Sequence, residues 1–197
     1  MKLFGFFAIS ARVAQATQSE RLATLLEMIK HYRPNFEDTK YFSYGCHCLI
    51  RGDQLDHHGT GQPVDALDSV CRKYKNCQKC VQFEYGKTCT EEAAYKIRYS
   101  SSGAIRARDR LATCEREVFN CDHQFAIELA EELDVYDQGF HTFMGPFDYN
   151  DPANCSKIQS RTIFKAECCG GVKSAFTLFN SFGIQKCCPD GSVRNEC

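Results

Sequence analysis

The chain has 197 residues, 43% of them hydrophobic and 25% charged, with a formal net charge of −1 at pH 7. This length supports one core of moderate size with a small appendage, and the near-zero charge gives no global field that would favour nucleic acid. Fourteen cysteines indicate a disulfide framework in an oxidising compartment and argue against a cytosolic enzyme. Zinc is the competing explanation, but the spacing of Cys77 and Cys80 has no matching second pair.

The charges are unevenly distributed. Residues 71–110 contain ten Lys/Arg and four Asp/Glu, a balance of +6, whereas residues 115–151 contain ten Asp/Glu and one Arg, a balance of −9. We expect a solvated, bipolar surface.

Residues Met1–Ala16 resemble a secretion signal, with Lys2, a short apolar run and a small-residue cleavage site at Ala14-Gln15-Ala16. An ordinary N-terminal helix is the alternative. No run approaches the roughly 20 apolar residues of a membrane span, so no transmembrane segment is expected.

The next segment, Gln18–Tyr32, is a predicted helix that ends before Pro34. One apolar stripe follows helical spacing: Leu22, Leu25, Leu26 and Ile29. On pattern alone, such a stripe is more often core than a binding surface.

A predicted loop follows at Phe36–Asp53. Its end carries Arg51-Gly52-Asp53, a tripeptide that integrins can recognise, and potential metal ligands: Asp53, Asp56, His57 and His58. A solvated loop is the favoured interpretation, because ligands this close together in a loop lack a scaffold.

Two long helices are predicted next, at Val64–Cys80 and Ala104–Leu133, separated by a β-hairpin or irregular wing at Gln82–Ser102. Pro63 and the acidic residues Asp65 and Asp68 favour the start of the first helix. Cysteines six and seven residues apart on the two helices can link them as antiparallel neighbours: Cys71 and Cys77, and Cys114 and Cys121.

The turn-rich segment 136–152 is predicted to be a linker. It would separate a main domain, 17–135, from a tail, 153–197. This tail carries six cysteines and is too small to be stable without disulfide cross-links. The Cys-Cys-Gly and Cys-Cys spacings of this tail weakly resemble galaxin-type repeats.

Four ordered motifs resemble the secreted phospholipase A2 family, whose calcium loop, YGCxCGxGG, is followed by GxGxPxDxxD and by two helices with CCxxHDxC and CDRxxxxC. This chain has Tyr44-Gly45-Cys46-His47-Cys48, Gly59–Asp68, Cys71–Cys77 and Cys114-Glu115-Arg116 with Cys121. The resemblance covers about residues 21–133. It implies a mainly α, disulfide-rich fold with an N-terminal helix, two long antiparallel disulfide-linked helices and a small β-wing, followed by the cysteine-rich tail.

The resemblance also implies disulfides. Cys48–Cys71 and Cys77–Cys114 would anchor the helices, and Cys46 would bond to Cys155 or another tail cysteine. Val70 stands where the usual partner of Cys121 would be, so that partner stays open, with Cys80 and Cys89 available.

The family's catalytic positions are altered in this chain. Tyr74 replaces the histidine general base, Glu115 replaces the aspartate that orients it, and Gln78 stands where a supporting tyrosine is usual. Tyrosine, with a pKa near 10, is a poor base at neutral pH.

The family's calcium site is altered too, at the positions His47, Leu49, Arg51 and Lys75. Lys75 replaces a carboxylate ligand, and Leu49 and Arg51 replace glycines, so we expect no Ca²⁺ cofactor. By the same resemblance, the Leu22–Ile29 stripe could line a lipid channel.

These observations favour a secreted, extracellular pseudoenzyme that binds phospholipid or an extracellular protein, as in a matrix. One alternative is a membrane-perturbing, toxin-like protein, since some family members carry lysine at the calcium aspartate. A calcium-dependent phospholipid hydrolase is the remote alternative.

Overall fold

A computed structural model describes residues 20–50, 59–157 and 165–197 of the chain. The predicted signal segment 1–16, the start of the predicted N-terminal helix, Arg51 and the potential metal ligands at 53–58 lie outside the described residues. All fourteen cysteines are described, and they pair into seven disulfides. The predicted fold class is confirmed.

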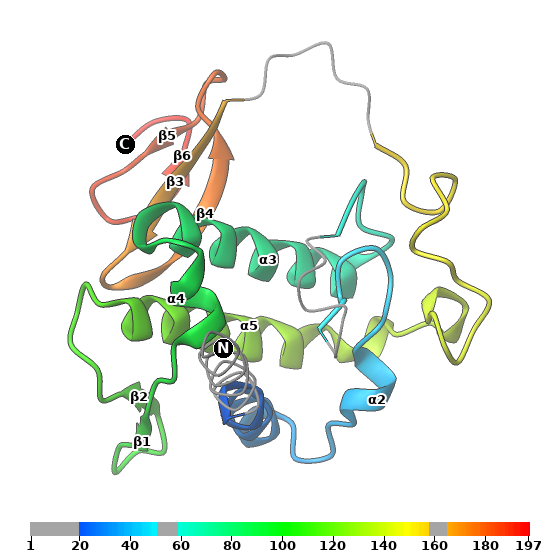
Figure 1. The fold of residues 1–197 in the computed structure, drawn as a ribbon, viewed down its shortest axis with the longest axis horizontal. Helices are drawn as coiled ribbons and strands as arrows, with labels where there is room; N and C mark the ends of the chain where they lie inside the picture. The colour runs from blue at the N-terminus through cyan, green and yellow to red at the C-terminus, as the bar shows by residue number, and fades with distance from the viewer. Residues whose placement is uncertain (1–19, 51–58, 158–164) are drawn as a thin grey trace, which may run out of the picture.

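Two long helices, α3 (Ala66–Tyr85) and α5 (Cys114–Glu132), lie side by side and antiparallel across the centre of the molecule (Figure 1). Asp65 caps α3 by accepting the N–H of Asp68 at 2.8 Å. The helix ends at Gly86, whose φ of +87° suits glycine. The Cys77–Cys121 disulfide links the two helices.

The second long helix is shorter than predicted, because residues 104–113 are not helical. Ile105–Ala107 form strand β2, which pairs antiparallel with β1 (Ile97–Tyr99) to make the β-wing. Ala112 has a positive φ of 57°, which no α-helix accommodates, and Thr113 caps α5 by accepting the N–H of Arg116.

The N-terminal helix, described over residues 20–32, packs into the main core together with α3 and α5. Leu25 and Ile29 are buried, and Leu22 and Leu26 are partly buried against the core. The predicted stripe is therefore a packing face. The chain also forms two short helices, α2 (Asp38–Tyr41) and α4 (Lys87–Glu92).

The segment predicted as a linker is packed against the body. It follows the 3₁₀ helix η2 (Leu133–Val135) and contains the 3₁₀ helix η3 (Gln138–Phe140) and a loop that leads into the Cys46–Cys155 disulfide. The carbonyl oxygen of Phe140 accepts the N–H of Gly45 at 2.9 Å. The domain limits remain a prediction.

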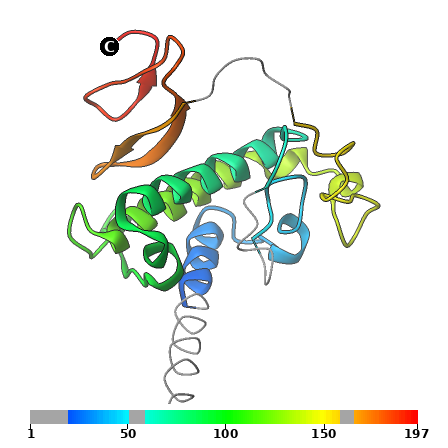
Figure 2. The ribbon, with the colours of Figure 1, turned by 45° about the horizontal axis from the view of Figure 1, so that its top comes forward.

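The tail forms two small antiparallel hairpins. The first consists of β3 (Ala166–Gly171) and β4 (Ser174–Asn180), and the second of β5 (Lys186–Cys187) and β6 (Val193–Arg194). Figure 2 shows the first hairpin lying along α3, and β4 contacts both α3 and α5.

Two features attach the first hairpin to the helices. The Cys80–Cys168 disulfide links α3 to β3, and the fully buried carboxylate of Glu117 accepts the N–H of Val172 at 2.8 Å. A buried carboxylate needs such donors, so Glu117 holds the hairpin tip at a defined place on α5.

No helix in the described part of the chain is long and apolar enough to cross a membrane.

Candidate functional site

Tyr74 of α3 and Asp122 of α5 face each other between the two long helices. The hydroxyl of Tyr74 donates to Oδ1 of Asp122 at 2.9 Å, and the Tyr74 ring stacks on Phe125 with centroids 4.2 Å apart. Three residues after Tyr74, Cys77 bonds to Cys121, the neighbour of Asp122. The disulfide therefore fixes the spacing of the pair.

Asp122 is fully buried, and Arg21 of the N-terminal helix neutralises it. Nη2 of Arg21 donates to Oδ1 at 2.7 Å and Nε donates to Oδ2 at 2.8 Å, a bidentate arrangement. The hydroxyl of Tyr95 donates to Oδ2 at 2.8 Å. Each carboxylate oxygen thus has two donors, and no lone pair is left to orient another group.

The guanidinium makes two further hydrogen bonds, and its Nη2 donates to the hydroxyl oxygen of Tyr74 at 3.3 Å. Its Nη1 donates to the carbonyl oxygen of Thr90 at 2.9 Å, and the side chain of Arg21 is 11% exposed. Arg21, Tyr74, Tyr95 and Asp122 therefore form one closed hydrogen-bonded network, which we call the Asp122 network.

The structure corrects two predictions at this site. The expected Cys77–Cys114 bridge is not formed, because α5 begins at Cys114, and Cys121, two turns further on, is the cysteine that lies opposite Cys77. Cys114 bonds instead to Cys89 of α4. The Cys48–Cys71 bridge is present.

The carboxylate that contacts Tyr74 also differs from the predicted one. Asp122, which follows Cys121, contacts Tyr74, whereas Glu115 lies in the first turn of α5 and is only partly buried. The sequence contains two Cys-acid pairs, Cys114-Glu115 and Cys121-Asp122, and the alignment of α5 along α3 decides between them. Gln78 is partly buried, and the hydroxyl of Tyr95 supplies the supporting contact.

No sequence pattern indicates that Arg21 is part of the site, because a single cation beside an apolar stripe is usually solvated.

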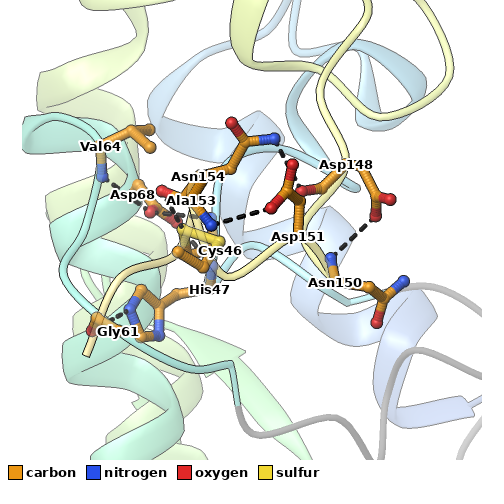
Figure 3. The surroundings of a disulfide bond; sticks show 11 residues. Cys46, His47, Gly61, Val64, Asp68, Asp148, Asn150, Asp151, Ala153 and Asn154 are labelled. Carbon is orange, nitrogen blue, oxygen red and sulfur yellow. Dashed lines mark hydrogen bonds between the residues drawn. A yellow bond between two sulfur atoms is a disulfide. The ribbon is translucent and has the colours of Figure 1, made fainter.

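The segment around His47 is held by Asp68, as Figure 3 shows. Asp68 accepts the backbone N–H groups of Cys46, His47 and Val64 at 2.9, 2.7 and 3.1 Å. Burial raises the pKa of the Asp68 carboxyl to about 6, although these three hydrogen bonds act in the opposite direction. Asp68 thus joins the two halves of the turn that leads into α3.

Of the predicted calcium-site positions, three are described. His47 and Leu49 are buried, and the carbonyl oxygen of His47 accepts the N–H of Leu49 at 2.8 Å. Lys75, the residue after Tyr74, is 3% exposed. Among the described residues, no group of three or more His, Cys, Asp or Glu side chains is placed to hold a metal ion.

The tyrosines of the Asp122 network should resist ionisation in the folded protein. Burial, and then the charge of Asp122, raise the pKa values of Tyr74 and Tyr95 well above 10. Because the folded-state pKa lies above the unfolded value, their contribution to stability is complete below about pH 10 and falls as the pH rises further. An alkaline titration followed by tyrosinate absorbance should therefore show these two groups ionising only with unfolding.

In the control variant Tyr74→Phe, one fewer tyrosine should ionise on unfolding. The tyrosines that ionise in the folded protein should be unchanged. Ionisation of all tyrosines near pH 10 in a folded protein would contradict this expectation.

Comparison with known proteins gives consistent matches. A sequence model described as phospholipase A2 matches residues 22–141. The chain is similar to group IID secretory phospholipase A2 of Mus musculus, with 31% identity over 125 residues, which cover 64% of this chain and 80% of that protein.

Two further relatives are more distant. The basic phospholipase A2 homolog acutohaemolysin of Deinagkistrodon acutus is 28% identical over 106 residues, 54% of this chain and 67% of that protein. A phospholipase A2 of Calliactis polypus is 26% identical over 133 residues, 68% of this chain and 77% of that protein. The family match stops at His141, so the tail hairpins lie outside it.

Proposed function

Since the chain belongs to the phospholipase A2 family, we propose that it is a secreted member that has lost hydrolysis and uses the disulfide-linked scaffold for binding. The observation that carries this proposal is the Asp122 network. It places a hydrogen-bonded tyrosine and a guanidinium where a base and a free orienting carboxylate would be needed. Seven disulfides support an extracellular setting.

A general base must accept a proton near neutral pH. Tyr74 holds its proton more tightly than a free tyrosine, because burial and the charge of Asp122 raise its pKa. Its hydroxyl also donates to Asp122, so ionising it would place two negative groups in contact. Water activation at Tyr74 therefore has no chemical route.

The residues present also do not fit Ca²⁺, the family's cofactor. Calcium takes six to eight oxygen ligands, including carboxylates. Here a buried lysine, Lys75, stands at the carboxylate position, and the His47 carbonyl already accepts a hydrogen bond. No step of the proposed function involves this ion.

A groove on the helix pair is available for a ligand. It has a volume of about 380 Å³ and lies between α3, α5 and β4, with Val70, Phe125, Phe176 and Leu178 among its walls. Lys73 and Glu128 form an ion pair of 3.0 Å in the same lining. Apolar walls with a polar rim suit an amphiphile such as a lipid chain with a polar head.

The test is a calcium-dependent hydrolysis assay on phospholipid vesicles, combined with calorimetric Ca²⁺ titration of the disulfide-intact protein. We expect neither hydrolysis nor calcium binding. The variant Tyr74→His/Lys75→Asp should remain inactive, because Arg21 still neutralises the charge of Asp122 and Leu49 still stands at a glycine position of the calcium loop. Hydrolysis by the wild-type protein would overturn the proposal. Calcium binding by the double variant would show that Lys75 alone excludes the ion.

A further inference from the structure

The loop that leads into the Cys46–Cys155 disulfide contains an acceptor pattern for sugar. Asn154-Cys155-Ser156 is the one place in the sequence where a serine or threonine stands two positions after an asparagine. In this pattern, with any residue except proline in the middle, the asparagine amide can receive a glycan during secretion. The family match stops at His141, so this loop lies outside it.

Both residues that a glycosyltransferase must reach lie at the surface. Asn154 and Ser156 are exposed. Cys155, between them, is 4% exposed, and its sulfur is bonded to that of Cys46. The backbone forms a turn here, because the N–H groups of Asn154 and Cys155 both donate to the carbonyl oxygen of Asp151, at 3.0 and 3.1 Å. The cysteine therefore anchors the loop, while the acceptor amide stays accessible.

The contact made by the Asn154 side chain is compatible with an attached sugar. Its Nδ2 donates to the carbonyl oxygen of Asp148 at 2.9 Å, as Figure 3 shows. An asparagine amide has two N–H groups, and the bond to a sugar replaces only one of them. A glycosylated Asn154 thus keeps one N–H with which to hold the carbonyl oxygen of Asp148.

We propose that Asn154 carries an N-linked glycan. In the transfer, Nδ2 of Asn154 forms a bond to the anomeric carbon of a sugar that is carried on a lipid pyrophosphate. The bond between that carbon and the phosphate oxygen breaks, Nδ2 loses one proton, and the lipid pyrophosphate leaves. The donor belongs to the secretory compartment, so this proposal rests on the secreted setting proposed above and is independent of the loss of hydrolysis.

The order of events during folding allows the modification. Once Cys155 is bonded to Cys46, the acceptor segment is held in a turn and no longer extends into a transferase. These two cysteines are 109 residues apart, and closing a loop of this length costs more entropy than local folding does. We therefore expect the bridge to close late, after the acceptor segment has entered the compartment with Cys155 still a thiol.

A glycan at this position would leave the groove on the helix pair open. In Figures 1 and 2 the loop of residues 148–157 lies at the opposite end of α3 and α5 from the tail hairpins. The walls of the groove include β4 and no residue of this loop. The glycan would instead cover the surface beside the turn that leads into α3, where the N–H of Gln62 donates to the carbonyl oxygen of Ser156 at 3.1 Å.

The test is expression of the full chain in animal cells, followed by treatment of the cellular and secreted protein with peptide-N-glycosidase. We expect a single glycan, whose removal converts Asn154 to aspartate, a change that peptide mass spectrometry detects. In a parallel version, residues 17–197 follow a signal sequence of established function. A glycan in this version alone would refute the predicted leader and still support the acceptor site.

The decisive variant is Ser156→Ala, which should abolish the modification although Asn154 and its contact with Asp148 remain. Ser156→Thr keeps the hydroxyl and should retain the glycan. The matched control is Asn150→Gln, at an exposed asparagine of the same loop that has no hydroxyl residue two positions on. It should be modified to the same extent as the wild-type protein.

A further variant tests the order of events. Cys46→Ala leaves the acceptor pattern intact and removes the partner of Cys155. It should be modified on at least as large a fraction of molecules as the wild-type protein, because the loop then stays open longer.

Three outcomes would overturn the proposal. The first is a wild-type protein that enters the secretory compartment in either version and carries no glycan. The second is a glycan that persists in Ser156→Ala. The third is a smaller modified fraction in Cys46→Ala than in the wild-type protein, since the acceptor would then require the closed loop.

Discussion

Replacing Arg21 by methionine is expected to cost about 3–5 kcal/mol of unfolding free energy at neutral pH. The change leaves the fully buried carboxylate of Asp122 with two tyrosine hydroxyls and no cation. It also removes the donor to the Thr90 carbonyl. Denaturant unfolding with the disulfides intact would measure the loss.

The control for this variant is Lys73→Met, which removes a cation from the exposed Lys73–Glu128 pair. The side chain of Lys73 is 66% exposed, so its loss should cost less than about 1 kcal/mol. Adding Asp122→Asn to Arg21→Met removes the unpaired charge, so the double variant should be more stable than the sum of the single losses. A cost for Arg21→Met as small as that of the control would show that the pair is not a structural element.

Removing the Cys80–Cys168 disulfide with a Cys80→Ala/Cys168→Ala variant is expected to cost about 3 kcal/mol. The bond spans 88 residues in sequence, but Cys46–Cys155 and Cys77–Cys121 shorten the loop that it closes. The first hairpin would then be held to the helices by the Glu117–Val172 hydrogen bond and by packing of β4. Limited proteolysis should release the tail faster, because local opening becomes easier.

The matched control is Cys188→Ala/Cys197→Ala, which opens a bridge of nine-residue separation at the end of the chain. It should cost less and leave the release of the first hairpin unchanged. If both variants lost the same stability and released the tail at the same rate, Cys80–Cys168 would not be the anchor of the hairpin.

The helical scaffold could be predicted from the sequence better than the site, because the residues that specify it lie close together in the chain. The Gly59–Asp68 turn and the cysteines of α3 lie within a few turns of one another, and they place the start of this helix to within two residues. Its end was predicted wrongly, because α3 continues past Cys80 to Tyr85 and the short helix α4 occupies part of the predicted wing. The start of α5 depends on Ala112, whose positive φ no sequence pattern marks. Whether Cys114 or Cys121 faces Cys77 depends on how the two helices align along their length, and the structure places Cys121 there.

The contacts between distant segments could not be read from the chain. Arg21 and Asp122 are 101 residues apart, and Glu117 and Val172 are 55 apart. Each of these charged residues taken alone has the pattern of a solvated side chain on an amphipathic helix. Only the packing of whole helices buries Asp122 and Glu117 and supplies their donors.

The Asp122 network also bears on whether the proposed loss of hydrolysis could be reversed in evolution. A return to a base–carboxylate pair requires both a new residue at Tyr74 and the departure of Arg21 from Asp122. The first change alone removes the Tyr74 hydroxyl from Oδ1 of Asp122 while Arg21 still neutralises the carboxylate, and the second alone leaves a buried carboxylate without a cation. Each single step lowers stability before any activity could return, so selection for a folded protein alone is enough to keep the present arrangement.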